Sequence, residues 1–150
     1  MLADDRTTTT IDRDTFTITF HRTFGTPREL VFEAWTRPEH VVHWWDPSGV
    51  RLEECAIDLR VGGRFKFVNA GSHHSPPFEG EYTTIEPPTE LRFLAMGATG
   101  TVRLEVAGAG TSMTVSIRCA NAEHLAKFVE LGVAEGTART LDNLVAHLSR

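Results

Sequence analysis

Two adjacent glutamates are the residues in this sequence best placed for acid–base chemistry. Glu53 and Glu54 lie where the alternation of a strand pattern changes phase, so the sequence leaves open which of them faces inward. Glu79 and Glu81 alternate with Tyr82, and we expect them to face solvent. A buried carboxyl with a raised pKa can serve a cyclase or hydrolase as general acid or base. Glu53 and Glu54 are therefore the catalytic candidates, and no nucleophile motif accompanies them.

Two histidines could share one face of a short helix. His40 and His43 are three residues apart, a spacing that metal sites use. Asp46 follows close behind, but no cysteine or second acidic residue is placed to complete a set of ligands. We expect solvated histidines and no metal, and the absence of a glycine-rich phosphate motif predicts no nucleotide cofactor.

Aromatic residues are the strongest signal in the sequence. Rings of this size either fill a core or line a cavity for a hydrophobic ligand, and the sequence leaves both interpretations open. Trp44 and Trp45 are adjacent, so both cannot point inward from one helical turn, and we expect at least one at a cavity mouth or on the surface. The aromatic candidates for ligand binding are Trp35, Trp44, Trp45, Phe65, Phe67, Tyr82, Phe93 and Phe128.

One long helix and a run of strands must position these residues. Apolar residues recur at helical spacing from Ala122 to Arg150, which predicts a single helix of about seven turns. Most of the preceding chain alternates with period two, apart from two short helices after the first strand. The predicted order is one strand, two short helices, six strands and one long helix. In the simplest α+β arrangement this helix crosses one face of an antiparallel sheet, and the functional site lies between them.

Two glycines interrupt the apolar stripe of the predicted helix. Gly132 and Gly136 are one turn apart, and each costs a helix interior about 1 kcal/mol relative to alanine. Either a strand backbone or a large ring packs closely against them, or the missing side chains leave a hollow beneath the helix. Both glycines are therefore candidate ligand-binding residues.

The N-terminal residues differ in composition from the rest of the chain. Residues 1–14 are polar and rich in threonine, so we expect a flexible tail there and one domain over residues 15–150. The N-terminus has no apolar signal sequence and no apolar run approaches the length of a membrane span, which predicts a cytoplasmic protein without membrane insertion. Cys55 and Cys119 lie in strand patterns and are expected to be buried free thiols.

The charged residues argue against a polyanionic partner. The net charge is −5 with neutral histidines, and the arginines are scattered along the chain. No basic block occurs, so the sequence predicts no binding of nucleic acid. A small hydrophobic molecule remains the expected partner, bound by a monomer or a homodimer.

Several segments resemble one protein family. The sequence is similar to the Activator of Hsp-90 ATPase homologue-like family in three segments. These are FGTPRELVFEAWTRPEH over residues 24–40, WWDP over 44–47 and DLRVGGRFKF over 58–67. Residues 78–82, 85–88 and 91–93 and the Glu135-Gly136 pair fit it too. This family belongs to the START/SRPBCC superfamily. The resemblance implies the helix-grip fold of birch-pollen-allergen-like proteins, a curved seven-stranded antiparallel sheet around a long C-terminal helix.

The resemblance also implies a class of function. Members of the superfamily bind lipids, hormones or polyketides between helix and sheet, a few are cyclases, and the proteins that give the family its name act on a chaperone. The matching motifs are structural, so no catalytic residue is carried over. Many relatives have a bulky residue where this chain has Thr137, which implies extra space beneath the helix. We therefore expect a non-enzymatic module for a small hydrophobic ligand, with a chaperone-interaction module and an enzyme as alternatives.

Overall fold

A curved antiparallel sheet and four helices make up the part of the chain that the computed structural model describes, residues 6–71 and 76–149. The strands are β1 (Thr8–Asp12), β2 (Thr17–Phe24), β3 (Glu54–Ile57), β4 (Arg64–Val68), β5 (Phe78–Glu86), β6 (Glu90–Ala95), β7 (Ala98–Ala107) and β8 (Gly110–Arg118). The helices are α1 (Arg28–Thr36), α2 (Pro38–Trp44), α3 (Ala122–Glu130) and α4 (Val133–Leu148).

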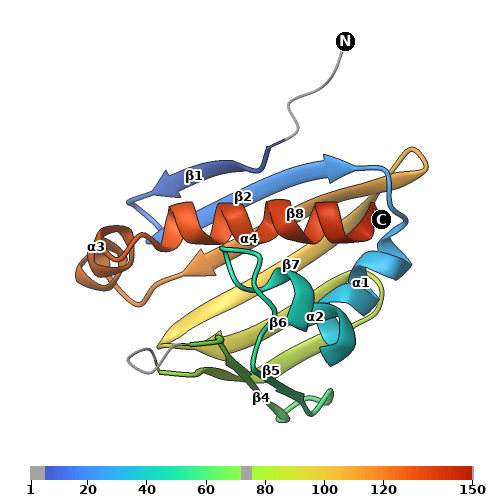
Figure 1. Ribbon diagram of the computed structural model, residues 1–150. Helices are drawn as coiled ribbons and strands as arrows, with labels where there is room; N and C mark the ends of the chain where they lie inside the picture. The colour runs from blue at the N-terminus through green and yellow to red at the C-terminus, as the bar shows by residue number, and fades with distance from the viewer. Residues whose placement is uncertain (1–5, 72–75, 150) are drawn as a thin grey trace.

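The sheet pairs a strand from the start of the chain, β2, with the last strand, β8. The strand order is β1-β2-β8-β7-β6-β5-β4-β3, and all neighbours are antiparallel. Figure 1 shows α4 lying along one face of the sheet beside β2 and β8, with α1 and α2 close to its C-terminal end. Helix α4 contacts α1, α2, β1 and β2. This arrangement confirms the predicted α+β helix-grip fold, although the sheet has eight strands and not the seven expected.

The extra strand comes from the segment that we predicted to be part of a tail. Thr8–Asp12 forms β1 and pairs with β2, from Thr8 opposite His21 to Asp12 opposite Thr17. The Asp12 carboxylate accepts hydrogen bonds from the backbone N–H groups of Asp14 and Thr15 at 2.9 and 3.2 Å, which closes the turn between the strands. The prediction of a tail was wrong for these residues, and residues 1–5 lie outside the described part.

The predicted C-terminal helix is broken in two. Gly132, between α3 and α4, has a φ of 78°, in the left-handed region that ends one helix and lets the chain start another in a new direction. Its carbonyl accepts the N–H of Gly136 at 2.9 Å and so begins α4. At the start of α3, the Asn121 side chain accepts the N–H of His124.

Two glycines on the sheet make room for aromatic rings. Phe93 on β6 pairs with Gly100 on β7, and a Cβ atom on Gly100 would come within 2.5 Å of the Phe93 ring. Gly80 on β5 stands in the same relation to Phe65 on β4, at 2.4 Å. The two rings therefore lie against the backbone of the neighbouring strands, where a larger residue than glycine would collide with them.

The helices of the described residues include none with the length and apolar character needed to cross a membrane.

Candidate functional site

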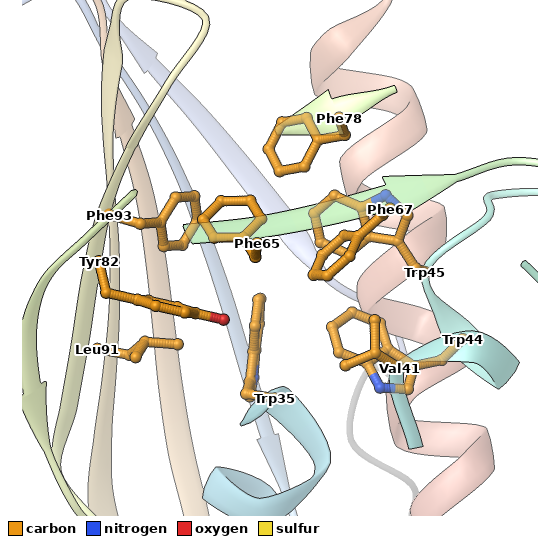
Figure 2. A pocket seen from close by; sticks show the side chains of 10 residues that line it. All are labelled: Trp35, Val41, Trp44, Trp45, Phe65, Phe67, Phe78, Tyr82, Leu91 and Phe93. Carbon is orange, nitrogen blue, oxygen red and sulfur yellow. The ribbon is translucent and has the colours of Figure 1, made fainter. Parts of the chain in front are cut away.

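Ten side chains converge between α1–α2 and strands β4 to β6, as Figure 2 shows. Phe65 is at the middle of this aromatic cluster, with ring centroids 5.1 Å from Tyr82 and 5.4 Å from Phe93. The space left among the rings is only about 10 Å³, hardly enough for one water molecule. The aromatic cluster is therefore packed core. Its members are Trp35, Val41, Trp44, Trp45, Phe65, Phe67, Phe78, Tyr82, Leu91 and Phe93.

The adjacent tryptophans have different environments. Trp44 is fully buried, and its Nε1–H donates to the carbonyl of Ala34 at 3.0 Å. Trp45 is half-buried, and its ring lies 4.9 Å from Phe67. The Trp45 carbonyl accepts the hydroxyl of Thr140 at 2.9 Å, so this end of α2 is tied to α4. Trp45 thus stands at the edge of the core, where it also faces a second space.

This second space is a cavity of about 310 Å³ beneath the first half of α4. Its floor comes from β6, β7 and β8, and α3 contributes one wall through Phe128. The volume falls within the range of small-molecule sites, about 300–1,000 Å³. Its described lining residues are uncharged: Trp35, Trp45, Pro47, Asn69, Phe78, Phe93, Ala95, Met96, Ala98, Gly100, Val115, Ser116, Ile117, Phe128, Val133, Gly136, Thr137, Thr140 and Leu141.

The structure divides the candidate ligand-binding residues into three groups. Those at the cavity are Trp35, Trp45, Phe93, Phe128 and Gly136. Those that contribute only to the aromatic cluster are Trp44, Phe65, Phe67 and Tyr82. Gly132 lines neither space. Ligand binding by any of these residues stays a prediction, but five of them line the same cavity.

Gly132 and Gly136 differ in whether the structure requires a glycine at that position. Gly136 lines the cavity, and a Cβ atom there would lie 3.8 Å from Cγ of Pro47, an ordinary contact. An alanine would fit, so no close packing demands this glycine. Gly132 is required by its left-handed backbone, and the interpretation of Gly132 as a missing side chain above a hollow was wrong.

Small inward-facing residues on the sheet were missed in the sequence. Ala98 and Gly100 on β7 and Ala95 on β6 line the cavity, opposite the gap at Gly136 and Thr137 on α4. Ala95 and Ala98 leave volume that larger side chains would fill, whereas at Gly100 the space is taken by the Phe93 ring. The sequence did contain a sign of the cavity: Ala98 and Gly100 are two positions apart, so two small residues lie on the inner face of one strand.

Polar contacts hold the loop that follows α2 against one side of the cavity. The Asp46 carboxylate accepts hydrogen bonds from Asn69 at 2.7 Å and from the Ser48 hydroxyl at 2.6 Å. Asn143 on α4 donates to the Asp46 carbonyl at 3.0 Å. Burial raises the pKa of Asp46, but the hydrogen bonds from Ser48 and Asn69 outweigh it and hold this pKa below the ordinary value. The loop is thus anchored to both α4 and β4.

Burial also keeps other titratable groups near the aromatic cluster neutral. It raises the pKa of the Cys55 thiol to about 11. Burial, with a smaller effect of nearby Cys55, raises the pKa of the Tyr82 hydroxyl as well. Neither group is set to act as a base at neutral pH.

The catalytic candidates lie outside the cavity. Glu53 and Glu54 are both exposed, and Glu54 forms an ion pair with Lys66 at 3.6 Å. The register of β3 against β4 is regular, without the bulge expected there, and neither glutamate lines the cavity, so this pair does not form the expected cavity carboxylate. This corrects the hypothesis of a cyclase or hydrolase that uses Glu53 or Glu54.

A third histidine, His147 on α4, contacts both members of the predicted histidine pair. Nδ1 of His40 lies 2.9 Å from Nε2 of His147 on α4, and the His43 ring stacks on His147 with centroids 5.6 Å apart. Over residues 6–71 and 76–149, no group of three or more His, Cys, Asp or Glu side chains is arranged to hold a metal ion.

The fold and the cavity together define a helix-grip protein with a hollow beneath its C-terminal helix. A family model described as Activator of Hsp90 ATPase homolog 1-like protein matches residues 25–149. This match spans most of the chain, so the protein belongs to that family. No curated protein matches the chain.

Solved structures share the fold at low sequence identity. Protein Ms6760 from Mycobacterium smegmatis is 22% identical with a TM-score of 0.83, over 95% of this chain and 98% of that one. A protein from Arthrobacter aurescens is 23% identical with a TM-score of 0.84, over 95% and 91%. An AHSA1-like protein from Aeromonas hydrophila is 25% identical with a TM-score of 0.72, over 89% and 92%. These similarities show that the proteins share one fold.

Proposed function

We propose that this protein binds a small hydrophobic molecule in the cavity between α4 and the sheet. The observation that carries the proposal is the cavity of about 310 Å³ whose described lining has no charged side chain. An apolar space of this size is costly to leave empty, because its walls lose the contacts that a filled core would give them. A ligand that enters it recovers these contacts and leaves water.

Three observations favour a binding site over a defect in packing. Gly136 and Thr137 on α4 face Ala98 and Gly100 on β7, so small residues from two distant segments meet across the same space. The adjoining aromatic cluster is tightly packed, which shows that the chain fills its core elsewhere. The family membership favours the same place for a ligand.

A titration with N-phenyl-1-naphthylamine tests the proposal. This neutral dye fluoresces strongly only in a dry environment, and we expect a saturable rise with one site per chain. Native mass spectrometry of protein purified from cells should in addition show an added mass that is lost on denaturation. A fluorescence rise that stays linear with dye concentration would contradict the proposal.

The name of the family suggests a second candidate, an interaction with a chaperone ATPase. The name describes the family, and for this chain the interaction is a proposal that the ATPase rate of a bacterial Hsp90 can test. We expect a rise in that rate if this chain is an activator. An unchanged rate at saturating protein would exclude the activity.

A further inference from the structure

Met96 occupies a backbone position that does not suit methionine. It forms, with Gly97, the two-residue turn between β6 and β7, on either side of which Ala95 pairs with Ala98. The φ angles of Met96 and Gly97 are 54° and 76°, so both residues are in the left-handed region. Hairpin turns of this kind favour asparagine followed by glycine, because most other side chains are strained there. Gly97 fits its position, whereas the turn does not explain Met96.

Packing does not explain Met96 either. Among the described residues, Phe16 is the other non-glycine residue with a positive φ, at 58°. Its side chain packs against the hydrophobic core and its carbonyl accepts the N–H of Cys119 at 2.8 Å, so tertiary contacts offset the backbone strain. The Met96 side chain is 59% exposed and does not belong to the core. A large apolar residue that is both strained and exposed points to a role outside the stability of the turn.

Met96 is also part of the wall of the cavity beneath α4. Of the described lining residues, Met96 and Pro47 are the two that are exposed, so they mark where the cavity meets solvent. Pro47 is rigid, and it directly follows Asp46, which hydrogen bonds tie to Asn69 and Asn143. Methionine is unbranched and flexible, so it adapts its shape to a neighbouring surface. The mouth of the cavity therefore has one anchored border and one adaptable border.

We infer that Met96 closes over a ligand at the mouth of the cavity and slows its escape. This inference rests on the proposed function and names the residue that controls release from the same site. The strain in the turn is present with and without ligand, whereas the contact between Met96 and a ligand exists only in the bound state. A stabilising contact that only the bound state has lowers the dissociation rate.

Met96→Asn separates the effect on binding from the effect on stability. Asparagine suits the left-handed first position of the turn, so we expect the melting temperature to rise by roughly 1–4 °C. The variant also loses the contact of the thioether with an aromatic ligand. The dissociation rate of N-phenyl-1-naphthylamine, measured by stopped-flow dilution, should therefore rise roughly 3- to 10-fold. A residue that served only the fold would not make the protein more stable and the complex shorter-lived at once.

Met96→Leu and Leu94→Asn are the control variants. Leucine keeps an apolar side chain of similar volume at the mouth, so the dissociation rate should change less than about 2-fold. Leu94 lies on β6 as well and is 47% exposed, but it does not line the cavity. Leu94→Asn therefore makes the same kind of polar change away from the cavity, and it should leave the dissociation rate unchanged.

The methyl group of Met96 gives a readout in the wild-type protein. In protein labelled with ¹³C at the methionine methyl groups, the Met96 signal is identified by its loss in Met96→Leu. Binding of the dye should shift this signal upfield, because an aromatic ring then lies over the methyl group. Met113 is an internal reference, since it is 1% exposed and does not line the cavity.

The outcomes distinguish this inference from the proposed function. A Met96 signal that does not move at saturating dye, a Met96→Asn dissociation rate equal to that of the wild type, or an equal increase in Leu94→Asn would each overturn the inference. The proposed function would stand in those cases, because the wild-type protein still binds the dye. If the wild type shows no saturable binding, the proposed function and this inference both fail.

Discussion

At the scale of single residues, Asp46 joins three segments that lie far apart in the sequence. Its carboxylate accepts a hydrogen bond from Asn69, and its carbonyl accepts one from Asn143 on α4. Sequence analysis gave this residue no role beyond its place after the histidine pair and in the WWDP segment, because a carboxylate bonded to distant amides leaves no pattern along the chain. The hydrogen bonds depend on folding, and so does the lowered pKa.

We expect Asp46→Asn to reduce stability by about 1 kcal/mol near neutral pH, since it weakens hydrogen bonds to the carboxylate. The pKa of Asp46 is lower in the folded state than its ordinary value of 3.8, so the stabilisation is present above about pH 4 and is lost as the pH falls through the folded pKa. The difference in melting temperature between wild type and variant should therefore shrink in acid. Asp14→Asn, at an exposed position, is the control, and a difference that grows in acid would contradict the assignment.

The two cysteines give a second prediction at this scale. Burial raises the pKa of Cys55 to about 11 and raises that of Cys119 as well. At about pH 8 only about one Cys55 thiol in a thousand is then ionised, and the thiolate is the reactive form. Labelling with dithiobis(nitrobenzoate) should be slow in the native protein and fast in guanidinium chloride. Immediate labelling of one equivalent in native protein would mean that a thiol is accessible and ionised.

At the scale of elements, the sequence predicted the α+β order correctly and missed two boundaries. The alternation of apolar and polar residues was enough for β2 and β4 to β8, since each buries one face. Strand β1 is exposed on nearly all its residues, so it has no alternation to read. The family resemblance contributed the curvature of the sheet, which periodicity alone does not specify.

The break between α3 and α4 was missed for a different reason. Apolar residues continue at helical spacing on both sides of Gly132, so the pattern alone favours one helix. A glycine is compatible with a helix interior and with a left-handed turn, and only the backbone of the folded protein distinguishes them.

This difference predicts opposite effects for alanine at the two glycines. Gly132→Ala should lower the free energy of unfolding by about 1–2 kcal/mol, because alanine is strained in the left-handed region. Gly136→Ala should raise it by up to about 1 kcal/mol, because the position is helical and has room for a Cβ atom. Urea denaturation measures both changes. Two changes of the same sign would show that one of the two backbone assignments is wrong.

At the scale of the whole molecule, the candidate site is the result of packing that no single segment reveals. The aromatic residues were recognisable in the sequence, but the division between the packed cluster and the cavity depends on where β6 to β8 curve beneath α4. Phe65 and Tyr82 belong to the packed side, whereas Trp35 and Phe93 face both. Sequence reasoning therefore identified the rings and could not tell which of them border open space.

The central claim is that the space beneath α4 is a real hollow that accepts a ligand. Gly136→Leu tests this claim directly, because its side chain would extend from α4 into the cavity. Filling an empty apolar space should stabilise the protein by about 1 kcal/mol. The same side chain should compete with N-phenyl-1-naphthylamine for the space. Arg139→Leu, on the exposed side of the same helix, is the matched control and should leave dye binding unchanged.

The decisive measurement is the melting temperature of Gly136→Leu beside its affinity for the dye. The cavity predicts a melting temperature that rises while dye binding is lost. Overpacking of a filled core would instead cost about 1–3 kcal/mol. A clear fall in the melting temperature of Gly136→Leu, with dye binding no weaker than in Arg139→Leu, would contradict the cavity and the function proposed for it.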